Sequence, residues 1–121
     1  MLPLEKSTKV YLSLRATDMR RGSRSLSGAV EEHFGRSSLD GAIYVFISRD
    51  RKKVKLLYWE RDGYWLCYKR LETSTFRVRL GEDGSEELTG VNLKELLRGV
   101  DLKRIKLEQK VEEHLSEKEA A

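Results

Sequence analysis

The chain has 121 residues, enough for one domain with a modest core, and charged residues make up 36% of it against 39% hydrophobic. No apolar run approaches the roughly 20 residues of a membrane span, which argues against a membrane protein. The single cysteine, Cys67, excludes an internal disulfide, so we expect a reducing, cytoplasmic location and a thiol packed in the core.

The charge is unevenly distributed along the chain. Residues 1–80 hold 17 Lys/Arg and 9 Asp/Glu, a net charge of +8 (17 minus 9). Residues 81–121 hold 7 and 11, a net charge of −4 (7 minus 11). A basic body favours a polyanionic partner such as nucleic acid. The alternative is a solubilising surface whose charges are unevenly spread.

Two strands and a helix are predicted in the first 50 residues. Residues 9–14 alternate apolar and polar side chains, which is typical of a half-buried strand. Thr17 and Asp18 are suited to cap a first helical turn, and Gly22 then indicates a break. From about Ser23, apolar residues recur at helical spacing up to a stop at Gly35. Residues 41–49 are apolar on both faces and rich in β-branched and aromatic residues, which predicts a central strand.

A hairpin is predicted next, around Asp62-Gly63, because a type I′ turn needs positive φ at both central residues. With these two residues as the loop, Lys55 lies opposite Arg70. Like charges in that position are unfavourable unless an anion lies between them. The face that carries this pair and Trp59 is therefore predicted to contact phosphate, with an ordinary strand whose basic end points into water as the alternative.

The remaining segments add a strand and helices. Residues 75–80 alternate again and predict a strand, and the acidic, glycine-bearing stretch 81–87 predicts a loop. Residues 92–99 predict a short helix capped by Asn92 and stopped by Gly99.

A last, charged helix is predicted over 102–117, with a frayed end. The predicted fold is α+β: a mainly antiparallel sheet of about five strands, with one helix before the central strands and two helices at the C-terminus. Residues 1–101 form the predicted single domain, and residues 102–121 the charged C-terminal helix.

No catalytic site is predicted. Four carboxylates lie near the basic segments and could hold a metal ion: Asp18, Glu60, Asp62 and Glu72. Three of them have a structural explanation. Asp62 belongs to the predicted turn, and Asp18 either caps a helix start or pairs with an arginine. Glu72 is expected to pair across the strands with Lys53. His33 and His114 lie on charged helical segments and are expected to be solvated. We therefore expect no enzyme, no metal and no cofactor.

The order and spacing of several motifs resemble one protein family. They are "TDMRRG" (17–22), "GAIYVFISRDRKKVKLLYWERDGYWLCYKRLE" (41–72) and "LLRGVD" (96–101). The chain is similar, from about residue 9 to 101, to the small accessory protein (TnpB type) of insertion-sequence-66 mobile elements, which is encoded beside a separate transposase. It departs from the family at Thr73-Ser74-Thr75, where relatives have a basic-Gly-basic turn, and at Val78-Arg79, where they have Trp-Pro.

The resemblance implies a non-catalytic accessory role in transposition, with DNA as the expected partner and the transposase as a second one. Ten residues are the candidates for DNA binding: Arg20, Arg21, Arg49, Arg51, Lys52, Lys53, Lys55, Trp59, Lys69 and Arg70. Arg20 and Arg21 lie beside a helix start, where backbone N–H groups also attract phosphate; alternatively one pairs with Asp18 and the other is exposed. The competing hypothesis is an adaptor that holds the transposase without touching DNA.

Overall fold

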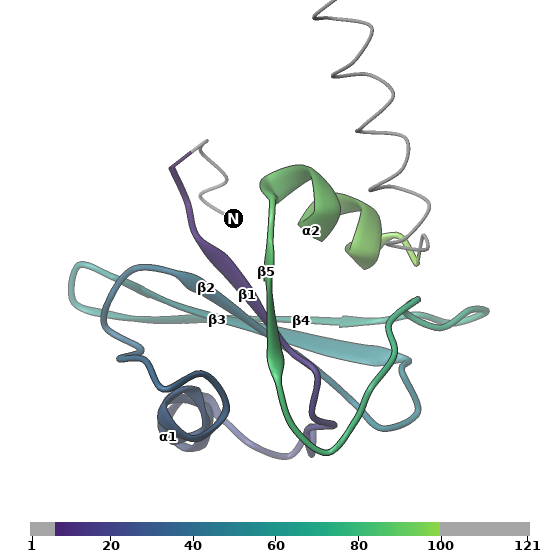
Figure 1. Ribbon diagram of the computed structural model, residues 1–121, viewed down its shortest axis with the longest axis horizontal. Helices are drawn as coiled ribbons and strands as arrows, with labels where there is room; N and C mark the ends of the chain where they lie inside the picture. Colours follow the sequence, from purple (N-terminus) through teal and green to yellow (C-terminus); the bar gives the residue numbers. More distant parts are fainter. Residues whose placement is uncertain (1–6, 100–121) are drawn as a thin grey trace, which may run out of the picture.

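A five-stranded sheet lies between two helices in the computed structural model, which describes residues 7–99 (Figure 1). In chain order the elements are β1 (Val10–Ser13), α1 (Ser23–Phe34), β2 (Ile43–Ile47), β3 (Lys53–Glu60), β4 (Gly63–Arg70), β5 (Ser85–Leu88) and α2 (Gly90–Leu97). The strand order is β4-β3-β2-β1-β5. The β1–β2 pair is parallel and the other pairs are antiparallel, so the predicted α+β class with a mainly antiparallel sheet is confirmed. The predicted helix 102–117 lies outside the described residues.

The middle strand, β2, is buried along its whole length. Its side chains alternate between the two faces of the sheet, as the pleat requires. Ile43, Val45 and Ile47 join one core, whereas Tyr44 and Phe46 join the other. The central position predicted from an apolar pattern on both faces is confirmed.

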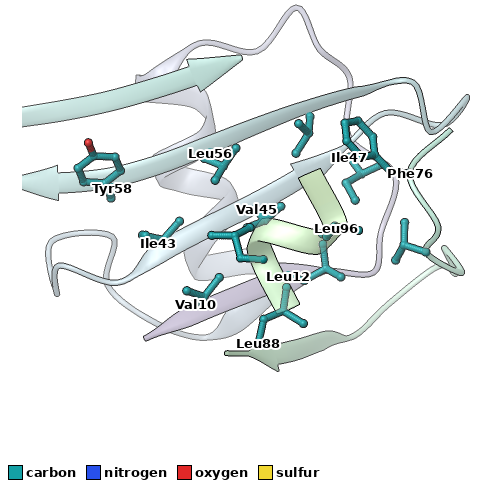
Figure 2. Packing of buried hydrophobic residues seen from close by; sticks show 13 residues of the cluster. Val10, Leu12, Ile43, Val45, Ile47, Leu56, Tyr58, Phe76, Leu88 and Leu96 are labelled. Atoms are coloured by element: carbon teal, nitrogen blue, oxygen red, sulfur yellow. The ribbon is translucent and has the colours of Figure 1, made fainter. Parts of the chain in front are cut away.

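The larger core fills the space between the sheet and α2. Leu93 and Leu96 of α2 are fully buried there against side chains of β1, β2 and β3. Figure 2 shows Leu96 among these side chains, with Phe76 contributing from the segment after β4. Cys67 packs against this core while partly buried, so it is a packing residue of the sheet.

The smaller core lies under α1. Leu26, Ala29 and Val30 recur at helical spacing, and all three are fully buried. The helix ends at Gly35, whose φ of 62° and N–H bond to Glu31 O form the predicted stop. The predicted break at Gly22 and helix start near Ser23 are confirmed, with Gly22 as the N-cap. The first turn, which was predicted to be helical, is a separate turn, where Asp18 accepts a hydrogen bond from Arg20 N.

The strand predicted over 75–80 is wrong, and the fifth strand lies in the predicted loop 81–87. Residues 75–80 alternate because Phe76 and Val78 are buried in the larger core, which needs no strand ladder. The acidic stretch instead supplies β5, which pairs with the open edge of β1. Backbone pairing with an edge strand therefore outweighs the local composition.

The C-terminal helix of the described region begins before its predicted cap. Thr89 is the N-cap, since its side-chain oxygen accepts a hydrogen bond from Asn92 N at 3.0 Å. Asn92 was predicted to be the cap; it lies one turn into α2 and is buried. Gly99 has a φ of 78° just past the helix, as a stop residue should.

The hairpin turn is shifted by one residue from its predicted place. Glu60 pairs with Gly63, so Arg61 and Asp62 form the loop. Asp62 N donates to Glu60 O at 2.6 Å, and Arg61 has a φ of 56°, which together describe a γ-turn centred on Arg61. Gly63 opens β4 without positive φ.

The strand register changes by two residues as a consequence. Lys55 faces Tyr68, and Lys53 faces Arg70, so the predicted pairing of Lys55 with Arg70 is wrong. Because the side-chain period of a strand is two, a shift of two residues leaves every side chain on its predicted face.

The position of the turn can be tested with two substitutions. Arg61→Gly should raise the free energy of unfolding by about 1 kcal/mol, since it relieves positive φ at a non-glycine residue. Gly63→Val should be neutral or slightly stabilising, because a strand favours valine and no atom lies within 4 Å of the added Cβ. Urea unfolding of both variants gives the comparison. If Gly63→Val unfolds the protein and Arg61→Gly leaves its stability unchanged, the turn lies at residues 62–63 instead.

Candidate nucleic-acid interface

The loop between β2 and β3 presents basic side chains on a rigid frame. Asp50 builds this frame: its carboxylate accepts hydrogen bonds from Ser48 Oγ at 2.5 Å and from Lys52 N at 3.0 Å, and it pairs with Lys53 Nζ at 3.2 Å. The Ser48 and Lys52 bonds are the main reason why the pKa of Asp50 lies far below its usual range. The carboxylate therefore stays ionised, and the loop backbone is held from within.

Three arginines line a hollow of about 460 Å³ beside this loop. They are Arg49 and Arg51 of the loop and Arg79 of the segment after β4, and Glu82 lies among the other lining residues. The two segments are fastened together, since Phe76 N donates to Arg51 O at 2.6 Å. None of the three arginines forms an ion pair with another residue in the described part of the chain. We call this the arginine hollow.

Arg79 was missing from the predicted site. Its alternation with the buried Phe76 and Val78 already indicated that it points outward. The sequence could not show that it joins Arg49 and Arg51, because that proximity depends on the path of an irregular segment.

A wider open groove of about 950 Å³ adjoins the hollow on the α1 face of the sheet. Its lining residues are Thr17, Asp18, Met19, Arg20, Ser48, Arg49, Asp50, Lys53, Lys55 and Tyr68. Arg49 lines both the groove and the arginine hollow, so the two are continuous. Four of the ten predicted residues line the groove, and Arg49 and Arg51 line the hollow.

The turn before α1 forms one side of the groove. Asp18 accepts a hydrogen bond from the backbone N–H of Arg20 at 2.9 Å and pairs with its guanidinium at 2.6 Å. The Arg20 guanidinium lowers the pKa of Asp18 to about 2. The Arg21 guanidinium donates to Ser25 Oγ at 2.6 Å. The pairing of Arg20 with Asp18, which was the alternative to a DNA contact, is thus present. The Arg20 side chain is nevertheless 91% exposed.

Two of the predicted lysines donate hydrogen bonds to backbone carbonyls inside the protein. Lys55 Nζ donates to Met19 O and to Arg21 O, both at 2.8 Å, and so holds the turn against the sheet. Lys69 Nζ donates to Leu97 O at 2.7 Å, where a cation complements the C-terminus of α2. Lys69 also lies on the opposite face of the sheet from Lys55.

Of the other predicted residues, Lys52 and Arg70 lie at the open end of the hairpin, whereas Trp59 lies near its turn. Lys52 is exposed, and Arg70 lies 3.9 Å from Glu72 in an exposed pair. The predicted pair of Glu72 with Lys53 is wrong, since Lys53 contacts Asp50 instead. Trp59 is half-buried with its ring edge-on to Tyr64 at 5.0 Å, and it lines neither the groove nor the hollow. The aromatic side chain in the groove is Tyr68, which was not among the predicted residues.

No metal site or membrane span is found in the described region. Within residues 7–99, no group of three His, Cys, Asp or Glu side chains could hold a metal ion. None of the helices in this region is long and apolar enough to cross a membrane.

The structure thus defines a small α+β domain in which basic side chains gather at one end of the sheet. Residues 8–107 match the family described as IS66 Orf2 like protein, and the chain belongs to this family. Membership indicates an accessory role in transposition, and the family is that of an accessory protein rather than of a known enzyme.

Two similar proteins come from Sinorhizobium fredii (strain NBRC 101917 / NGR234). The uncharacterized protein y4hO is 33% identical over 101 residues, which cover 84% of this chain and 88% of that protein. The uncharacterized protein y4jC is 24% identical over 106 residues, covering 88% and 91%. No solved structure matches the chain significantly.

The role of Lys55 can be separated from DNA binding. Lys55→Met keeps the apolar stem and removes the ammonium, leaving Met19 O and Arg21 O without their donor. We expect the free energy of unfolding to fall by about 1–3 kcal/mol. Lys52→Met is the matched control, because that side chain is exposed. Equal urea midpoints for the two variants would show that the turn does not depend on Lys55.

His33 gives the fold a dependence on pH. It was expected to be solvated, but it is half-buried, with Nδ1 2.8 Å from Oγ of the buried Ser13. Burial and the nearby Arg15 and Arg21 lower its pKa below the ordinary 6.5, while Glu32 and Asp83 act against this.

The lowered pKa of His33 decides the direction in which stability changes with pH. The unfolded chain takes up the His33 proton first as the pH falls through about 6.5, so the free energy of unfolding should decrease below that pH. Replacing His33 by Gln should flatten this part of the stability curve, measured by urea unfolding between pH 7 and pH 5. His114→Gln is the control, and a His33→Gln curve with the wild-type slope would contradict the assignment.

Proposed function

We propose that this protein is a non-catalytic transposition accessory factor that acts in the cytoplasm and binds DNA through its phosphate backbone. The surface for this contact is the basic end of the sheet: the arginine hollow with Lys52, Arg20 and Lys53 beside it. The arginine hollow carries the proposal, because its three guanidinium groups lack partners among the described residues.

Arginine is suited to this role. Its planar guanidinium donates two parallel hydrogen bonds to a phosphate and stays charged at any physiological pH. Phosphate contacts position a protein on DNA without reading sequence. The rigid loop around Asp50 would hold Arg49 and Arg51 in place before DNA arrives, which reduces the entropy lost on binding.

The salt dependence of binding tests this proposal. Each phosphate contact on duplex DNA contributes about 0.9 to the slope of log affinity against log salt. Replacing Arg49, Arg51 and Arg79 together by Ala should weaken binding to an element-end duplex and lower that slope by up to roughly 2.7. Fluorescence anisotropy across a salt series measures both quantities, with random duplex as competitor.

The control variant removes two positive charges elsewhere. Arg61→Gly lies at the far tip of the hairpin and Lys94→Ala on α2, and the double variant should keep the wild-type slope. If the wild-type protein binds no duplex at low salt but binds the transposase, the adaptor hypothesis replaces this one. In that case the basic end would meet an acidic protein surface, and unrelated DNA would not compete.

A further inference from the structure

We propose that the groove on the α1 face binds an unpaired nucleotide, with its base stacked on Tyr68 and its phosphates directed toward the arginine hollow. This rests on the proposed function and adds the form of the DNA: single-stranded or locally opened rather than fully paired.

Tyr68 is placed to receive a base. Its side chain is 53% exposed, and within the described residues it has no aromatic ring partner. Trp65 on the same strand is similarly exposed at 50%, but its ring stacks on Tyr58 at 6.5 Å and its indole N–H donates to Glu60 at 2.7 Å. Tyr68 is therefore exposed without an aromatic partner in the described residues, whereas the Trp65 ring is already held by Tyr58 and Glu60.

The walls of the groove are suited to a flat, largely apolar ligand. Met19 contributes an apolar side chain from the turn, and Lys55 directs its ammonium to the Met19 and Arg21 carbonyls, so its methylene chain lines the groove. The volume of about 950 Å³ lies within the range of roughly 300–1,000 Å³ typical of small-molecule sites.

The charges of the groove favour an anionic backbone. Four cations line it against two carboxylates, a net charge of +2 (4 minus 2). Both carboxylates are already engaged, Asp18 by Arg20 and Asp50 by Lys53. Arg49 belongs to both the groove and the arginine hollow, so a strand whose base lies on Tyr68 can pass its next phosphates to the hollow.

A paired base could not use this site. Within a duplex each base is covered on both faces by its neighbours, so a ring inside a groove meets only a base that has left the stack. Stacking of unpaired bases on aromatic rings beside a positive surface is the common mode of single-strand binding.

The experiment compares a labelled single-stranded oligonucleotide with its own duplex at one salt concentration, by fluorescence anisotropy. We expect the wild-type protein to bind the single strand more tightly. Tyr68→Ala should weaken single-strand binding by about 5- to 150-fold, the range contributed by one base stacked on an aromatic ring, and leave duplex binding unchanged. Tyr68→Phe should restore the single-strand affinity, because it keeps the ring.

Trp65→Ala is the matched control, since it removes an equally exposed aromatic from the same strand on the opposite face. It should not change single-strand binding. If the wild type binds duplex at least as tightly as single strand, or if Tyr68→Ala weakens both equally, the inference is overturned while the proposed function stands. If neither form of DNA binds at low salt, the proposed function itself fails. Circular dichroism melts of each variant confirm that it is folded.

Discussion

The burial of β2 on both faces is the constraint from which the rest of the fold follows. A strand with five buried residues in a row needs a cover on each side, and this chain supplies α1 for one face and α2 for the other. Both edges of β2 are also taken, by β1 and β3. The basic residues of the β2–β3 loop lie at the end of the sheet where β2 meets β3.

Two groups of cations in the described region have different surroundings. Lys55 and Lys69 donate to backbone carbonyls and fasten a turn and a helix to the hairpin. Arg49, Arg51 and Arg79 have no such partner in the described region and line the arginine hollow. Net charge alone does not distinguish these two groups. A lysine that donates to backbone carbonyls adds as much positive charge as an arginine that is exposed to solvent.

How far the sequence predicts the structure depends on whether a signal is local. The strand predicted over 41–49, the helix ending at Gly35 and the faces of the hairpin follow from local composition and spacing, and they are confirmed. The position of β5 could not be predicted in this way. This strand forms by pairing with the open edge of β1, which lies more than 70 residues earlier in the chain. The turn was misplaced by one residue because Asp-Gly is a strong statistical signal, yet here the strands select a γ-turn at Arg61.

The pairing of β1 with β5 has a consequence for how the protein is made. Val10 lies opposite Leu88, so an N-terminal strand completes its hydrogen bonds with nearly the last described segment to leave the ribosome. Pairings this distant in sequence slow folding, and synthesis delays them further. The arginine hollow also needs residue 79 beside residues 49 and 51. A nascent chain that has not reached residue 79 therefore lacks the arginine hollow, so the anion binding proposed for it would be confined to the finished molecule.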